Sequence, residues 1–190
     1  YYSDLAFDET TGQANRKDVY ERPKVEQVFT NSLIAYDEEF FGLEEYDEND
    51  RLVIDFKKLD ADKADEEKVD IVIIEPDVNY DLGVIMTESA EDDPPVVMEM
   101  GSKELVINGV GIGNKYGVVA KGGGEITIND VGNITIAANS SEGDASAIYV
   151  DGYDEWYEEY VTGTKIKINV AKDNHIVTLE ANGAAKDNAV

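Results

Sequence analysis

Apolar and polar residues alternate along several short segments in the second half of the chain. Alternation of this kind places the aliphatic side chains on one face of a β-strand and the polar side chains on the other. The pattern therefore predicts a series of short, half-buried strands. The aliphatic pairs that flank a single polar residue are Ile126 with Ile128, Ile134 with Ile136, and Ile166 with Ile168.

Three short apolar segments recur in the same order between residues 81 and 190. Each set begins with small residues before an aliphatic pair, as at 117–119 and 145–148, and continues with two alternating segments. Aligning the small residues gives one step from Gly83 to Gly117 and a shorter step from Gly117 to Ser146. A repeated set of three strands predicts a solenoid, in which each strand pairs in parallel with its counterpart one coil away while the loops vary in length.

The core of such a solenoid is expected to consist of aliphatic residues stacked from coil to coil. We expect Ile126, Ile134, Ile166 and Ile176 to stack on similar residues and to fill a narrow interior. Glycine and asparagine at the corners supply the bends, because they adopt positive φ at little cost. The interpretation is an all-β chain with three short strands per coil, about four coils and irregular acidic insertions.

The first half of the chain is less regular. Residues 1–26 are interpreted as an entry segment or cap, and 27–190 as the solenoid, with an irregular part at 27–80 and regular coils at 81–190. Strands are expected within 27–36, 52–56 and 69–74, because these segments are rich in aliphatic residues and bounded by charge. The aromatic and acidic residues of 37–50 predict a side excursion that folds back through its aromatics.

The chain is strongly acidic, with 42 Asp and Glu against 16 Lys and Arg and a formal net charge of -26. This charge excludes nucleic acid and anionic membrane surfaces as expected partners, because both require cationic patches. It is compatible with divalent cations or basic partners. Cysteine is absent, which suits export of an unfolded and unbridged chain.

Residues that could support catalysis are few. His175 is the single histidine, and without cysteine it lacks the companions of a zinc site. Ser140, Ser141 and Ser146 have no base at a useful spacing, which disfavours a Ser-His-Asp hydrolase. The glycines at 122–124 lead into a strand without the lysine of a phosphate loop, so we interpret them as a turn. The sequence predicts no catalytic residue and no cofactor.

Calcium is possible but unsupported by a motif. Acidic runs at 47–50, 60–67 and 91–93 offer oxygen ligands, yet neither an EF-hand loop nor a glycine-rich calcium repeat is present. We expect these acidic runs to form solvated charged loops.

One insertion concentrates aromatic residues among acids. It holds the only tryptophan, and its aromatic residues are spaced as on one face of a short helix. The insertion either packs on the rod or forms a recognition patch for a basic protein or a sugar. The candidate binding residues are Tyr153, Asp154, Glu155, Trp156, Tyr157, Glu158, Glu159 and Tyr160.

The segments GEITINDVGNITIAANSSEGDASAIYVDG and TKIKINVAKDNHIVTLEANGAAKDNAV resemble the passenger region of bacterial autotransporters. The resemblance covers residues 80–190 and, more loosely, 27–80. It rests on the small-residue segment at 145–150, the paired Ile-x-Ile segments and the Gly and Asn corners. It implies a right-handed parallel β-helix cut from a longer rod, located outside the cell or on the bacterial surface. The implied partners are a protein or glycan on host or sister cells, or another copy of the chain.

The function that we expect is therefore a non-catalytic adhesin or structural rod module. Two alternatives stay open. Parallel β-helices include pectate lyases and polygalacturonases, although Arg16, Arg22 and Arg51 all precede the repeats and the later lysines are scattered. A polysaccharide-active enzyme of that kind would require clustered cations on one face. The other alternative is a fibre subunit that assembles end to end.

Overall fold

The computed structural model describes residues 3–7, 14–18, 22–37, 40–76, 83–111, 113 and 115–184. These residues form mostly β-structure, as the alternating pattern predicts, together with two short 3₁₀ segments, η1 (Phe56–Asp60) and η2 (Asp65–Glu67). The described residues contain no α-helix. The chain therefore belongs to the all-β class.

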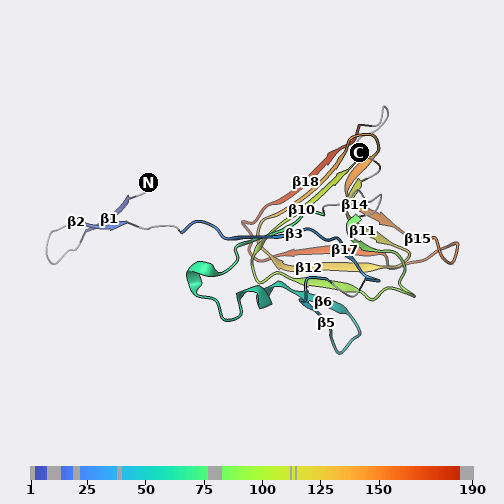
Figure 1. Cartoon of the computed structure of the whole chain (residues 1–190), viewed down its shortest axis with the longest axis horizontal. Helices are drawn as coiled ribbons and strands as arrows, with labels where there is room; N and C mark the ends of the chain where they lie inside the picture. The colour runs from blue at the N-terminus through green and yellow to red at the C-terminus, as the bar shows by residue number, and fades with distance from the viewer. Residues whose placement is uncertain are drawn as a thin grey trace.

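Most strands lie in three sheets, which we number by the order in which the chain enters them (Figure 1). Sheet 1 contains β3 (Glu26–Phe29), β7 (Ile71–Ile74), β10 (Glu104–Gly111), β13 (Ile134–Ser140) and β18 (Val177–Asn182). Sheet 2 contains β4 (Leu33–Ile34), β8 (Gly83–Thr87), β11 (Lys115–Lys121) and β14 (Ala145–Asp151). Sheet 3 contains β5 (Glu44–Tyr46), β6 (Leu52–Asp55), β9 (Val96–Glu99), β12 (Glu125–Val131) and β17 (Lys165–Val170).

Neighbouring strands within these sheets are parallel, except for β5, which pairs antiparallel with β6. The chain passes through sheets 1, 2 and 3 in that order and then returns to sheet 1, a path that we call a circuit. Figure 1 shows the three sheets on three sides of a common interior. Two antiparallel pairs lie outside the sheets, β1 (Ser3–Phe7) with β2 (Ala14–Asp18) and β15 (Tyr153–Asp154) with β16 (Glu159–Tyr160).

The interior is a single apolar cluster to which all three sheets contribute. In sheet 3, Ile126 lies beside Ile166, as the repeat predicts. In sheet 1, however, Ile134 lies beside Val177 and Ile136 beside Leu179. The expected stacking of Ile176 is wrong by one residue, and a one-residue shift reverses the face of every side chain. Ile176 instead sits at the corner, where its N–H donates to Asn133 Oδ1 at 3.0 Å and its side chain is exposed.

The repeat in sheet 2 is also displaced by one residue from the sequence alignment. Gly83 and Ser146 both lie beside Tyr116, rather than beside Gly117. Gly117 is required for packing, because an added Cβ would lie 2.4 Å from Ile136 Cγ2 and 2.5 Å from the Ala147 carbonyl oxygen. Gly83 and Gly117 are therefore sites where neighbouring atoms pack closely against the backbone, and they are not equivalent positions of successive circuits.

The first circuit is covered by the excursion at 37–50. Phe40 and Leu43 are buried, and the ring of Phe41 lies 4.2 Å from that of Phe29, measured between centroids. The predicted folding back through aromatics is thus confirmed. At the other end of the stack, the terminal strands are β14, β17 and β18, and each has a partner on one side only among the described strands.

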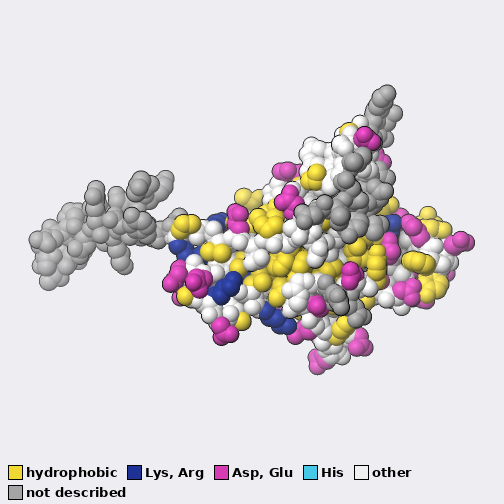
Figure 2. Space-filling view, in the orientation of Figure 1, with side chains coloured by type: hydrophobic (Ala, Val, Ile, Leu, Met, Phe, Trp, Pro, Cys, Tyr) yellow, Lys and Arg dark blue, Asp and Glu magenta, His cyan; other side chains and the backbone are white. Residues whose placement is uncertain are grey.

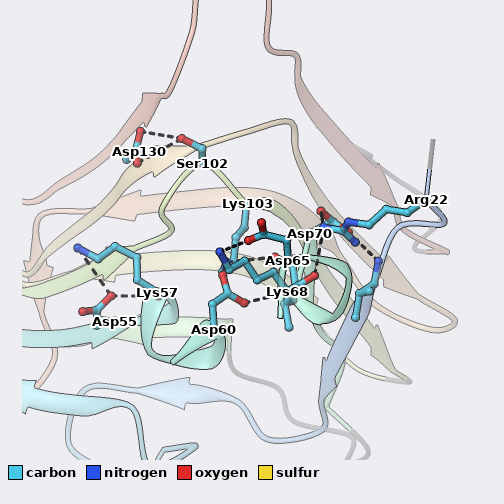
Figure 3. A network of polar contacts seen from close by, with 12 residues as sticks. Arg22, Asp55, Lys57, Asp60, Asp65, Lys68, Asp70, Ser102, Lys103 and Asp130 are labelled. Atoms are coloured by element: carbon cyan, nitrogen blue, oxygen red, sulfur yellow. Dashed lines mark hydrogen bonds and ion pairs between the residues drawn. The ribbon is translucent and has the colours of Figure 1, made fainter. Parts of the chain in front are cut away.

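Polar contacts connect the segment between β6 and β7 to the turn that precedes β10 (Figure 3). The Asp60 carboxylate accepts the Val69 N–H at 2.8 Å and pairs with the buried Lys103 ammonium, which also donates to the Val69 carbonyl oxygen at 3.1 Å. Burial of Asp60 opposes ionisation, but the bonds from Lys103 and Val69 outweigh it and hold its pKa below the ordinary value. Arg22 makes a similar bridge to Asp70 at 2.7 Å.

Candidate recognition hairpin

The eight candidate binding residues form a hairpin between β14 and β17, and this hairpin projects from the corner between sheets 2 and 3 (Figure 1). Tyr153 pairs with Tyr160 and Asp154 with Glu159, leaving a four-residue turn. The expected helical face is therefore wrong. The i, i+3, i+4, i+7 spacing reflects two short strands and their turn instead, because Asp154 hydrogen-bonds to the backbone of the turn.

We call residues 153–160 the aromatic hairpin. The turn of this hairpin is held in place by hydrogen bonds to the side chain of Asp154. Its Oδ1 atom accepts the N–H groups of Trp156 at 2.9 Å and Tyr157 at 3.1 Å, and its Oδ2 atom accepts the Ser89 hydroxyl at 2.7 Å. The side chain is buried with 1% exposure. The bond from Ser89, followed by the backbone bonds, outweighs desolvation and holds the pKa of Asp154 below its ordinary value. Asp154 therefore anchors the turn to the loop after β8 as an ion.

Gly122 permits this anchoring. It adopts φ +53, and an added Cβ would lie 2.5 Å from the Glu88 carbonyl oxygen and 2.8 Å from Asp154 Oδ2. Gly123 also has positive φ, so the prediction of a turn at 122–124 is confirmed.

Two aromatic side chains of the hairpin are largely exposed to solvent, one in the turn and one on β16. Trp156 is 73% exposed and Tyr160 82%, while the Tyr153 and Tyr160 rings pack on each other with centroids 5.1 Å apart. Figure 2 shows acidic and apolar side chains gathered together at this end of the molecule. Exposed apolar area of this kind is unusual on a soluble surface and marks interaction sites.

A groove of about 260 Å³ lies beside the tip, lined by Glu88, Lys121, Glu155 and Trp156. Lys121 donates to Glu155 Oε1 at 2.8 Å. Burial disfavours the charge of Lys121, but its bond to Glu155 and the nearby carboxylates outweigh this and raise its pKa. Burial also raises the pKa of Glu88, with Lys121 opposing the shift. The groove is therefore partly desolvated and carries both signs of charge.

Sequence reasoning missed Glu88 and Lys121. They follow Thr87 and Ala120, which lie side by side in sheet 2. An alignment of the repeats with the correct register would have placed the two residues together.

The other sequence candidates lie elsewhere. The Ser140 hydroxyl donates to the Gly113 carbonyl oxygen at 2.7 Å, and the His175 ring lies 3.4 Å from Asn133 Oδ1. In the acidic runs, Asp47 pairs with Arg51 at 2.6 Å, and Asp93 accepts the Glu88 N–H at 2.6 Å. No group of three or more His, Cys, Asp or Glu residues within the described ranges is arranged to hold a metal ion.

Comparisons with protein-family models, curated proteins and solved structures return no match to this chain. Among the described residues there is also no helix with the length and apolar character needed to cross a membrane.

Replacing Asp154 with alanine is expected to release the aromatic hairpin, because three donors lose their shared acceptor. The Asp154→Asn variant should keep most of the hairpin ordered, since the amide carbonyl oxygen of asparagine can accept the two N–H groups of the turn in place of Oδ1. Limited proteolysis should cut the alanine variant within 153–160 much faster than the wild type or the asparagine variant. Equal cutting of the alanine variant and the wild type would show that Asp154 does not hold the turn.

Proposed function

We propose that the chain forms a right-handed parallel β-helix of about four coils that is part of a longer rod. The repeated circuits through three parallel sheets around one core support this proposal. The handedness follows from the general preference for right-handed crossovers between parallel strands. Loops that leave the corners can then vary in length without disturbing the register, as the segment at 56–70 and the aromatic hairpin do.

We propose further that the chain is a non-catalytic module of a secreted or surface-exposed bacterial protein and mediates adhesion or self-association. The observation that carries this proposal is the exposed indole of Trp156 on a turn whose anchor, Asp154, is buried. A stiff support reduces the entropy lost on binding, and exposed Trp and Tyr side chains are frequent anchors of protein interfaces. The partner would be a protein or a glycan on host or sister cells, with an aromatic face towards the sugar or the apolar part of the protein.

The acidic surroundings of the hairpin favour a partner surface with basic groups. Glu91 and Asp92 act on Tyr157 and raise its pKa, chiefly through the charge of Asp92, and Glu155 flanks the groove. Carboxylates around an aromatic tip attract cations at long range and accept hydrogen bonds at contact. Binding should accordingly weaken as the salt concentration rises.

Replacing Trp156 with alanine is expected to weaken adhesion of the purified chain to its target cells roughly tenfold or more while leaving the melting temperature nearly unchanged. The indole is exposed, so its loss removes little packing within the fold. Binding of the labelled chain to whole cells, and to a panel of immobilised glycans, would measure the change. Tyr46→Ala is the matched control, because Tyr46 is an exposed aromatic residue on β5, outside the hairpin. A lower melting temperature with unchanged binding would contradict recognition by Trp156.

A further inference from the structure

Trp156 is held at two points although most of the residue is exposed. Its backbone N–H donates to Asp154 Oδ1 at 2.9 Å, and its side chain hydrogen-bonds to the Glu88 carboxylate. The indole N–H is the one polar group of this side chain, so the bond to Glu88 engages the edge of the ring and not its faces. Trp156 thus presents a positioned aromatic face beside the groove.

The lining of the groove contains more negative than positive charge. It holds two carboxylates, Glu88 and Glu155, and one ammonium, Lys121. Lys121 bonds to Glu155 at 2.8 Å, so among the described residues Glu88 is the lining carboxylate without a bonded cation. Burial raises the pKa of Glu88, and the charge of Lys121 and the bond from Trp156 oppose this rise without cancelling it. A cation supplied by a ligand would compensate the Glu88 carboxylate.

The size of the groove limits what can occupy it. Its volume of about 260 Å³ is below the roughly 300–1,000 Å³ of pockets that enclose a drug-sized ligand. One side chain of a protein partner therefore fits the groove better than an oligosaccharide does. A single neutral sugar ring could stack on the indole, but it would bring no positive charge to Glu88.

We propose that the groove binds an arginine side chain of a protein partner, with the guanidinium stacked on the indole of Trp156 and hydrogen-bonded to the carboxylate of Glu88. This proposal rests on the proposed function, because it specifies the partner of the aromatic hairpin. Two copies of a chain with a net charge of -26 repel each other, so the partner is a different and basic protein.

Arginine suits the groove better than lysine for three reasons. The planar guanidinium stacks on aromatic faces, and it donates two parallel N–H groups to one carboxylate. It is also more weakly hydrated than an ammonium, so it loses less on entering a partly desolvated groove. The bond from the indole uses one acceptor position of Glu88, and a carboxylate has further positions for the guanidinium.

The chain contains one tryptophan, so the indole fluorescence of the full chain reports Trp156 alone. The probes are the peptide acetyl-Gly-Arg-Gly amide and the same peptide with lysine or with citrulline, a neutral isostere of arginine. The arginine peptide should change the fluorescence in a saturable way, with an affinity at least about tenfold above that of the citrulline peptide. The lysine peptide should bind more weakly than the arginine peptide.

Glu88→Gln should weaken binding of the arginine peptide roughly tenfold at an unchanged melting temperature. Glutamine can still accept the indole N–H through its amide oxygen, so the variant removes the charge and keeps the position of the ring. Glu66→Gln is the matched control, because Glu66 is exposed on η2 and does not line the groove. Equal weakening in the two variants, or equal affinity for the arginine and citrulline peptides, would overturn the proposal.

Two further outcomes separate the arginine site from the proposed function. Loss of adhesion in Trp156→Ala, together with a wild type that does not respond to the arginine peptide, would overturn the arginine site and leave the proposed function intact. A response to a methyl glycoside in place of the arginine peptide would also overturn it and assign the groove to a sugar. Specific arginine binding by the wild type, with unchanged adhesion of Trp156→Ala, would support the site and contradict the proposed function.

Discussion

Replacing Ile136 with alanine is expected to lower the free energy of unfolding by about 2–5 kcal/mol. Ile136 is completely buried and lies between Ile107 of the preceding circuit and Leu179 of the following one. The truncation removes buried methyl groups and leaves a cavity that rigid neighbouring strands can fill only in part. Urea unfolding followed by far-ultraviolet circular dichroism would measure the loss.

Thr135→Ala provides the matched control. Thr135 is adjacent in the same strand, but its side chain is on the other face of the sheet and is partly exposed. We expect its replacement to change the free energy of unfolding by less than about 1 kcal/mol. Equal losses in the two variants would contradict the register of sheet 1.

Replacing Lys103 with methionine is expected to destabilise the fold by about 2–4 kcal/mol, because the change leaves the mostly buried Asp60 carboxylate without its cation. The Val69 carbonyl oxygen loses the same donor. Methionine keeps the apolar stem, so the effect reports the charge and the hydrogen bonds. Thermal and urea unfolding would measure it, and the double variant with Asp60→Asn should recover part of the loss.

Lys165→Met is the control for this ion pair. Lys165 bonds to Glu125 at 2.7 Å, but both side chains are well exposed, so the expected change in the free energy of unfolding is below about 1 kcal/mol.

The destabilisation caused by Lys103→Met should also depend on pH. The pKa of Asp60 is lowered in the fold from its ordinary value of 3.8, so its stabilisation is present at neutral pH and is lost as the pH falls below about 4. The difference between wild type and Lys103→Met should narrow in that range, and a constant difference would contradict the ion pair.

Part of the candidate site could be predicted from the sequence. A cluster of aromatic residues among acids between two strands indicates an excursion, and the structure places it at a corner between sheets. Its conformation could not be predicted, because the spacing of Tyr153, Trp156 and Tyr157 fits both a helical face and a hairpin. The choice depends on Asp154, whose bond to Ser89 joins residues that are far apart in the sequence. The groove residues Glu88 and Lys121 meet for the same reason.

The order and type of the strands were already determined by the local amino-acid sequence. Short strands with one apolar face are specified by the alternation at Ile126–Thr127–Ile128 and by the aliphatic segments of β6 and β7. The alignment between circuits was decided by the tertiary structure. Val177 stacks on Ile134 in place of Ile176, and Gly117 is small because Ile136 and Ala147 approach it. Periodicity records which face a side chain occupies, whereas register and close approach depend on neighbours about thirty to forty residues away along the chain.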